Sequence, residues 1–295
     1  RPDLALPWLA LAETRLFAAQ HDAALNAVLT ALAIDPTHAE AYRLLTESLR
    51  GQGFTAQSLL DCGRALAEKL ASQSMPESER QARLRDYHLN LAGLFVDWGR
   101  HGEAELHYRA ALAIDPECDE ARGGLLFAAN YRPDLDPLTA RREAERQGEA
   151  LARRRPQCDF HAHDRNPERP LRIGLVSGDF GRHPVGYLLA GPLACIDRER
   201  FQLHAYSTHA RNDRQTEVLR AAIPHWRDVD TFDDDALIEQ IRADGIDILI
   251  DLSGHTRHNR LTVFAARAAP VQVTWLGYFA TTGLSTMDSV SYTHL

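Results

Sequence analysis

The hexapeptide ALAIDP occurs twice, at residues 31–36 and again at residues 111–116, and this repetition strongly constrains how the first half can fold. Small residues recur at the same distance before each copy, at Ala24 and Ala104. Small side chains allow two antiparallel helices to cross closely, and a proline ends a helix because it cannot continue the hydrogen-bond ladder. The pattern therefore predicts stacked pairs of helices.

The spacing of these helix pairs resembles the tetratricopeptide repeat, a helix-turn-helix unit of about 34 residues. A weaker third copy lies between the two strong ones, and Tyr42, Leu45 and Ala65 keep its frame. We therefore predict three repeats within residues 1–130, about the number at which stacked repeats become stable. The array either binds extended polypeptide on a concave surface or acts as a scaffold that positions the rest of the chain.

Composition argues against several classes of protein. A formal net charge of −8 offers no basic surface for a nucleic acid. The four cysteines lie far apart without a C-x-x-C pair, which disfavours a zinc knuckle or a disulfide scaffold and fits a reducing compartment. Because no apolar run is long enough to span a bilayer and no signal peptide is recognisable, we expect a cytoplasmic protein without a membrane partner.

Residues 131–170 form a junction of different character, which we interpret as a linker that contains a charged helix over residues 138–155. The basic end of that helix either binds a phosphate or an acidic partner or is a solvated helix face. The polar stretch that follows holds His161, His163 and Asp164, and such a set is able to ligate a metal. Its prolines and lack of periodicity favour a flexible linker instead.

From residue 171 onward, apolar strands alternate with helices. This alternation predicts an α/β Rossmann-like lobe with a parallel sheet over residues 171–288, covered by helices on both faces. The predicted strands are residues 171–177, 201–207, 226–229, 246–252 and 271–276. Residues 289–295 look like an unrelated tail.

Three polar loops follow strands of this predicted sheet, and they contain the best candidates for a functional site. The carboxyl ends of parallel strands share one edge, where open α/β sheets bind their ligands, so we expect the loops to converge. Asp179 and His183 lie in the first loop, either as a pair that polarises a substrate or as a structural hydrogen-bonding pair. His255 and His258, near Asp251, are weaker metal-ligand candidates because a loop holds such a pair poorly.

Four motifs in this lobe, three of them long, resemble the bacterial relatives of the O-linked N-acetylglucosamine transferases, a group that includes the SPINDLY-type transferases. They read LRIGLVSGDFGRHPVGY, ADGIDILIDLSGHT, NRL and RAAPVQVTWLGYFATTGLSTMD. Such proteins join tetratricopeptide repeats to a two-lobed GT-B glycosyltransferase and move a sugar from a nucleotide donor to Ser or Thr hydroxyls. The resemblance implies a UDP-N-acetylglucosamine donor, acceptor proteins bound by the repeats, and no metal or cofactor; fucose users share these motifs, so the sugar stays open.

Several functional residues of the family also match positions in this sequence. It implies catalytic roles for Asp179 and His183 and substrate-binding roles for Arg260, Leu276, Gly277 and Phe279. Phe279 and Ala280 depart from the family because Pro and Gly are usual at these positions, and we expect the ring to narrow the sugar pocket. Asn130 stands where some relatives carry a histidine, so the resemblance assigns no general base.

After Asp288 the sequence departs from the family, whose members continue into a second lobe that binds the nucleotide. We therefore expect a C-terminally truncated fragment, which is inactive alone because a GT-B donor sits between two lobes. The alternative is a non-catalytic tetratricopeptide-repeat module that binds a partner and carries a structural α/β domain.

Overall fold

The computed structural model describes residues 4–49, 55–161, 163–164 and 166–291. The chain divides into two compact units, Arg1–Arg132 and Pro133–Leu295. Each unit is described by itself below.

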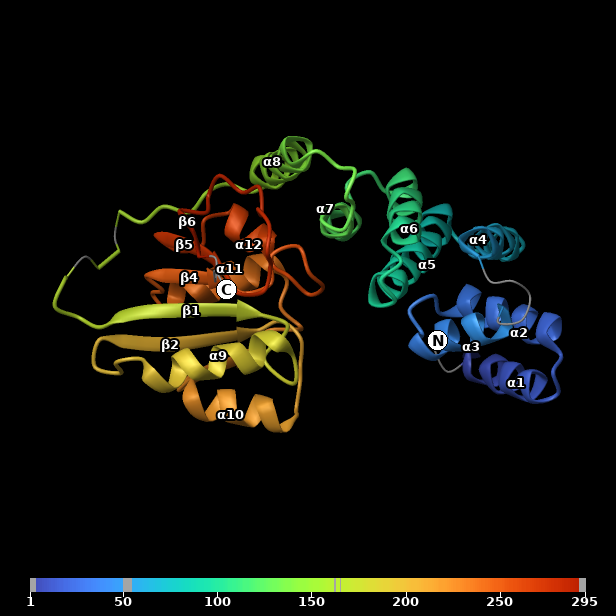
Figure 1. Cartoon of the computed structure of the whole chain (residues 1–295), viewed down its shortest axis with the longest axis horizontal. Coiled ribbons are helices and arrows are strands. Elements are labelled where there is room, and N and C mark those ends of the chain that lie inside the picture. The colour runs from blue at the N-terminus through green and yellow to red at the C-terminus, as the bar shows by residue number, and fades with distance from the viewer. Residues whose placement is uncertain (1–3, 50–54, 162, 165, 292–295) are drawn as a thin grey trace. The chain divides into compact units, whose positions relative to one another are not determined.

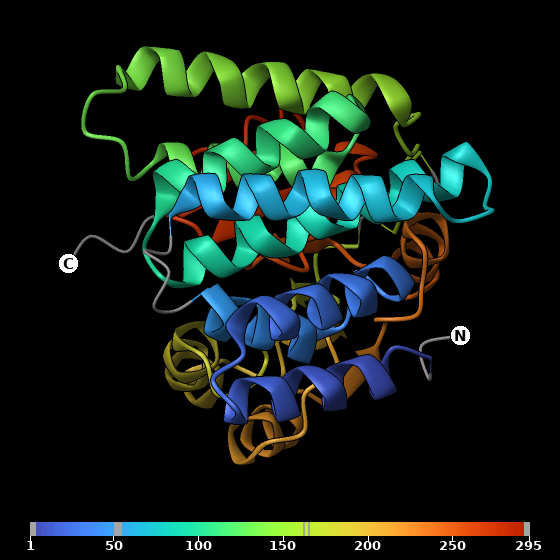
Figure 2. The same ribbon diagram turned by 90° about the vertical axis from the view of Figure 1, so that its right-hand side faces the viewer.

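The first unit consists of helices, most of which pack against the next helix in the chain, whereas α4 packs against α2 and α5 (Figures 1 and 2). Its described helices are α1 (Leu6–Phe17), α2 (His21–Ile34), α3 (Ala39–Leu49), α4 (Ala56–Ala71), α5 (Glu77–Asp97), α6 (His101–Ile114) and α7 (Asp119–Ala129). Helices α2 and α6 both end inside an ALAIDP copy, at the isoleucine. The aspartate that follows, Asp35 or Asp115, then accepts a hydrogen bond from a backbone N–H two residues later. The repeated hexapeptide thus encodes a repeated helix end.

Small residues form the contacts between these helices, as the repeat pattern predicts. Ala24, Ala31, Ala104 and Ala111 are completely buried. The backbones of neighbouring helices therefore approach closely, and larger leucine and aromatic side chains fill the remaining space in a single apolar core.

The second unit contains a six-stranded parallel sheet with the strand order β3-β2-β1-β4-β5-β6, which confirms the predicted α/β class. The strands are β1 (Leu171–Ser177), β2 (Phe201–Ser207), β3 (His225–Asp228), β4 (Ile248–Asp251), β5 (Val271–Trp275) and β6 (Ser289–Ser291). The helices are α8 (Pro137–Arg154), α9 (Pro184–Cys195), α10 (Arg214–Ala222), α11 (Asp234–Ala243) and α12 (Leu261–Ala265). The strand order reverses between β1 and β4, which is where doubly wound folds bind ligands.

Two apolar layers cover the sheet. Helices α9 and α10 contribute Leu189 and Leu219 to one layer, on the lower side of the sheet in Figure 1. Helices α8, α11 and α12 contribute Leu151, Ile241 and Phe264 to the other. The central strands β1 and β2 are buried along their carboxyl-terminal halves, as parallel strands between two layers of helices usually are, whereas the edge strands β3 and β6 are mostly exposed.

Helix α8 packs on the second unit, although we expected its residues to belong to a linker. The backbone of α8 approaches Gly283 so closely that a Cβ atom at Gly283 would lie 1.9 Å from the Ala144 carbonyl oxygen. A Cβ atom at Gly148 would likewise lie 2.1 Å from the Gly283 carbonyl oxygen. Gly283 also has a φ of +75°, which a residue with a side chain rarely adopts. The linker is therefore the stretch between α8 and β1.

Part of the predicted tail extends the sheet. Ser289–Ser291 forms β6, which pairs in parallel with β5, while residues 292–295 lie outside the described residues. The carboxylate of Asp288 starts this pairing, because it accepts hydrogen bonds from Arg267 and from the backbone N–H of Gln272. Within the described part of the chain, none of the helices has the length and apolar character needed to cross a bilayer.

Candidate active site

The loops after β1, β2, β4 and β5 meet at the carboxyl edge of the sheet. We name them the β1 loop (residues 178–183), the β2 loop (208–213), the β4 loop (252–260) and the β5 loop (276–283). Thr208 donates a hydrogen bond of 2.7 Å to the His258 carbonyl, which joins the β2 and β4 loops. A Cβ atom at Gly277 would lie only 1.8 Å from the Leu252 carbonyl oxygen, so the β5 loop touches the β4 loop through its backbone.

Two residues at this edge have a strained backbone. His258 and Leu276 have φ values of +62° and +72°, a region that residues with side chains rarely occupy. Such strain persists only where surrounding contacts enforce it, and it is common at binding sites. The β1 loop meets the β4 loop as well, because a Cβ atom at Gly178 would lie 2.7 Å from His258 Cβ. The three predicted loops thus converge as expected, with the β2 loop as a fourth member.

Asp179 is nearly buried at the start of the β1 loop, with 12 % of its side chain exposed. Its backbone N–H donates a hydrogen bond of 3.0 Å to the Ser177 hydroxyl. One carboxylate oxygen lies 3.7 Å from Nδ1 of His183, which is too long for a hydrogen bond. Asp179 and His183 thus lie close together, as expected from the sequence, but no hydrogen bond joins their side chains.

His183 caps the amino end of α9. Its Nδ1 atom accepts a hydrogen bond of 3.3 Å from the backbone N–H of Val185, and Pro184 occupies the first helical position, where no N–H is needed. A ring nitrogen that accepts an N–H carries no proton, so the neutral ring holds its proton on Nε2. With 39 % of its side chain exposed, His183 lies on the rim of the sheet.

Arg211 of the β2 loop is a site residue that sequence reasoning missed. Its Nε donates to the Gly178 carbonyl at 2.9 Å, and its Nη2 donates to Asp179 Oδ1 at 3.1 Å. The rule that drew attention to the other loops applies to β2 as well, because β2 ends at the same edge. The position of the β2 loop directly after a strand was therefore the sequence signal that could have identified it as part of the site.

The β4 loop is organised by a buried carboxylate. Asp251 accepts hydrogen bonds from the backbone N–H groups of Ser253 and Gly254 and from the Thr274 hydroxyl. Burial raises the pKa of Asp251, while these hydrogen bonds act in the opposite direction. This carboxylate therefore holds the loop in shape.

His255 is also buried in the β4 loop, and its Nε2 lies 3.0 Å from the Thr282 carbonyl oxygen. Burial lowers the pKa of His255 to about 4. Across the described residues, no three His, Cys, Asp or Glu side chains lie close enough to hold a metal ion.

The predicted substrate-binding residues differ in their exposure and in their bonding to the rest of the protein. Arg260 bonds Asp234 Oδ1 at 2.9 Å and the Phe232 carbonyl at 2.8 Å, so its guanidinium joins the β4 loop to the start of α11. Leu276 and Gly277 begin the β5 loop, and the Phe279 side chain is 58 % exposed. Substrate binding by these residues stays a prediction.

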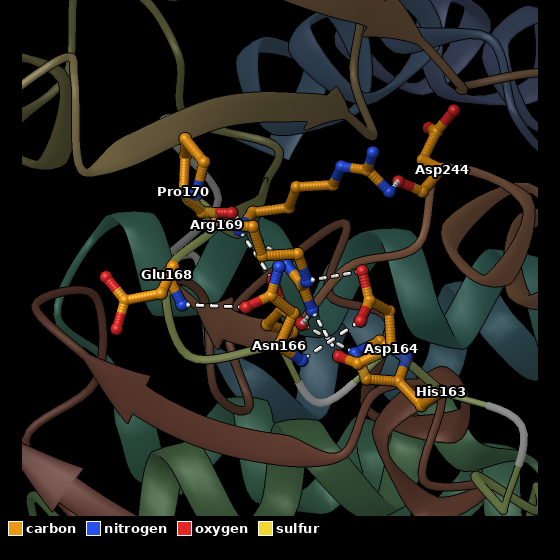
Figure 3. Close-up of polar contacts among 9 residues, drawn as sticks. His163, Asp164, Asn166, Glu168, Arg169, Pro170 and Asp244 are labelled. Atoms are coloured by element: carbon orange, nitrogen blue, oxygen red, sulfur yellow. Dashed lines mark hydrogen bonds and ion pairs between the residues drawn. The ribbon is translucent and has the colours of Figure 1, made fainter.

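His163 and Arg169, which precede β1, lie at the opposite, amino edge of the sheet, where β1 begins; Figure 3 shows both side chains. His163 and Arg169 both bind the carboxylate of Asp247, and the backbone N–H of Arg172 donates to the same carboxylate at 2.8 Å. The ring of His161 is 92 % exposed. This stretch thus fastens the linker to the lobe.

Comparison with known proteins gives concordant results. The model of glycosyl transferase family 41 matches residues 149–293. The chain is 38 % identical over 181 residues to the Arabidopsis thaliana protein named probable UDP-N-acetylglucosamine–peptide N-acetylglucosaminyltransferase SPINDLY, a match covering 59 % of this chain and 20 % of that protein. The tomato (Solanum lycopersicum) protein of the same name is 39 % identical over 184 residues, covering 60 % and 19 %. The match thus spans about a fifth of these relatives.

A solved structure is similar as well. A mutant of the Thermobaculum terrenum O-GlcNAc transferase superposes with a TM-score of 0.69 and 32 % sequence identity, covering 98 % of this chain and 54 % of that one. This likeness extends over both units of the chain.

Proposed function

We propose that this chain, which belongs to glycosyl transferase family 41 with the SPINDLY and O-GlcNAc transferases, is part of a protein O-glycosyltransferase. The protein transfers a sugar, N-acetylglucosamine from UDP-N-acetylglucosamine in the first instance, to Ser or Thr hydroxyls. The names of its relatives support this donor and this type of acceptor. They also favour an enzyme over a non-catalytic binding module.

The observation that carries the proposal is the polar rim at the carboxyl edge of the sheet, with the His183 ring exposed beside Asp179. Transfer forms a bond from the acceptor hydroxyl oxygen to the anomeric carbon and breaks the bond from that carbon to the nucleotide phosphate. Negative charge grows on the leaving phosphate, and the hydroxyl proton must be removed. In this proposal His183 offers its Nε2–H to a substrate oxygen and orients it.

The remaining parts of the proposal concern partners and setting. We infer that the helix pairs of the first unit are tetratricopeptide repeats that bind acceptor proteins, that the protein works in the cytoplasm, and that transfer uses no metal or prosthetic group. The repeated hexapeptide with its repeated helix end supports the repeat assignment.

The test uses a full-length protein that contains these residues. It is incubated with a Ser/Thr-containing protein and either UDP-N-acetylglucosamine or GDP-fucose, and the mass added to the acceptor is measured. We expect addition of N-acetylhexosamine by the wild type and a rate at least tenfold lower for His183→Asn. Absence of transfer from either donor would overturn the proposal, whereas transfer of fucose alone would overturn the sugar assignment.

A further inference from the structure

Arg211 links two loops that come from neighbouring strands. It reaches from the β2 loop to the β1 loop and bonds a backbone carbonyl and a carboxylate with one guanidinium, at 2.9 Å to Gly178 and 3.1 Å to Asp179. Its side chain is 28 % exposed and that of Asp179 is 12 % exposed. Two bonds from one planar group fix direction as well as distance.

The β2 loop also holds the far end of the β1 loop. Asp213 Oδ2 accepts a hydrogen bond of 2.8 Å from the backbone N–H of Arg182, while its other oxygen caps α10. Between these two points the loops are packed too tightly for a side chain. A Cβ atom at Gly181 would lie 2.7 Å from Asp213 Oδ2 and 2.8 Å from Arg211 Cδ. The β2 loop is thus a clamp over the whole β1 loop.

The clamp gives the two oxygens of the Asp179 carboxylate different neighbours. Oδ1 is bound to Arg211, and Oδ2 remains 3.7 Å from Nδ1 of His183. If the carboxylate moved closer, it would attract a proton to Nδ1, because a carboxylate accepts hydrogen bonds and does not donate them. The Nδ1 atom would then lose its bond to the backbone N–H of Val185, and Nε2 would lose its proton.

We propose that Arg211 is a positioning residue, which holds the Asp179 carboxylate away from His183 and so keeps the His183 proton on Nε2. His183 then presents an N–H donor, and not a bare nitrogen, to an oxygen atom of the bound substrate. The statement about substrate rests on the proposed function, whereas the statement about the proton rests on the geometry alone. The two are tested separately.

The position of the proton is measured by 15N NMR of the histidine rings in the purified chain. The spectrum is recorded at about pH 8.5, where free imidazole is neutral. The His183 signal among the 14 histidines is assigned by its loss in His183→Asn. We expect the Nε2–H form in the wild type, and an Nδ1–H form in the wild type would overturn the proposal without any further variant.

Arg211→Gln then tests the cause. We expect the Nδ1–H form to become the main form of His183 in this variant. Arg214→Gln, which changes an exposed arginine three positions away, is the matched control and should keep the wild-type form. Arg211→Lys keeps the charge but cannot bond Gly178 and Asp179 as a planar fork. The fraction of His183 in the Nδ1–H form should therefore lie between those of the wild type and Arg211→Gln. If Arg211→Gln and Arg211→Lys both keep the wild-type form, the proposal is wrong.

The functional part is tested in the full-length enzyme. Arg211→Gln should lower kcat by about tenfold while KM changes less than twofold and the melting temperature stays within a few degrees, since misplacing a reacting group lowers rate more than binding. Unchanged kcat together with a changed ring proton would overturn the role in transfer. An inactive wild-type enzyme with the expected proton positions would count against the proposed function and leave the positioning role intact.

Discussion

Arg169 and Asp247, which lie 78 positions apart in the sequence, form a two-pronged ion pair at the amino edge of the sheet. His163 bonds the same carboxylate. Burial alone would raise the pKa of Asp247, but the hydrogen bonds from Arg169, the Arg172 backbone and His163 lower it to about 2. The linker is thereby fastened to the strand that carries the β4 loop at its other end.

Asp247 should make the stability of the second unit depend on pH. Its pKa is about 2 in the folded chain and about 3.9 when unfolded, so the contribution is fully present above pH ~4 and is lost as the pH falls through about 2. Asp247→Asn should lower the free energy of unfolding by about 2 kcal/mol at pH 7 and flatten the acid dependence.

Urea unfolding at several pH values measures both effects. Asp164→Asn is the control, because Asp164 also faces Arg169 but its side chain is 66 % exposed. It should cost less than about 0.5 kcal/mol. Equal effects of the two variants would contradict a special role of Asp247.

His183 should matter for transfer more than for folding. His183→Ala removes the cap of α9, which typically costs about 1 kcal/mol, or roughly 2–4 °C in a unit of this size. We expect turnover in the full-length enzyme to fall more than tenfold. His183→Asn restores a capping side chain, so recovered melting temperature with low turnover separates the two roles, and near-normal turnover by His183→Asn would show that capping is the main role.

Gly283→Ala should strongly destabilise the second unit. The new Cβ atom would meet the Ala144 carbonyl oxygen, and the residue would keep a φ of +75°. We expect the free energy of unfolding to fall by more than about 2 kcal/mol, because the backbone is strained and α8 is pushed away from the β5 loop. Gly191→Ala is the comparison, since nothing lies within 4 Å of a Cβ atom there and an alanine suits the helix. Thermal melts that rank the two variants the other way would refute this packing.

The helical unit should lose stability in mild acid. His88 and His107 are buried with their Nδ1 atoms 3.0 Å apart, and burial lowers their pKa values to about 4 and about 3. Because the unfolded chain takes up these protons near pH 6.5 and the folded chain does not, stability falls as the pH drops from about 6.5 to 4, by on the order of 3 kcal/mol for each histidine.

A variant identifies the source of this acid sensitivity. His107→Phe should reduce it, because phenylalanine does not titrate and the ring already stacks on Phe95. His161→Phe changes an exposed ring and should behave like the wild type. An acid profile of His107→Phe that matches the wild type would exclude this pair as the cause.

The architecture was largely predictable because it follows local patterns. Apolar strands that alternate with helices specify a parallel sheet, and the common edge of its strands indicated where Asp179 and His183 lie. The proton on Nε2 of His183 was not predictable, because it depends on one backbone N–H group. Arg211 escaped notice because its partners lie on another strand, and an arginine in a polar loop forms no periodic pattern.

Helix α8 was assigned to the linker for a related reason. Its charged residues dominate the sequence, while the contact with the lobe involves Ala144, Gly148 and Leu151. Two of these have small side chains, so the many charged residues of the helix outweighed its narrow buried face in the sequence. The contact became visible only in the structure, because Gly283 follows β5 in the sequence whereas α8 precedes β1.

The approach of α8 to Gly283 has a practical consequence for cloning. A gene fragment that begins at the first strand would encode a lobe whose β5 loop exposes bare backbone and whose core lacks Leu151. Such a product would be a poor candidate for expression, because apolar surface left open to water promotes aggregation. A start codon placed before Pro133 would keep the helix and the lobe in one translated piece.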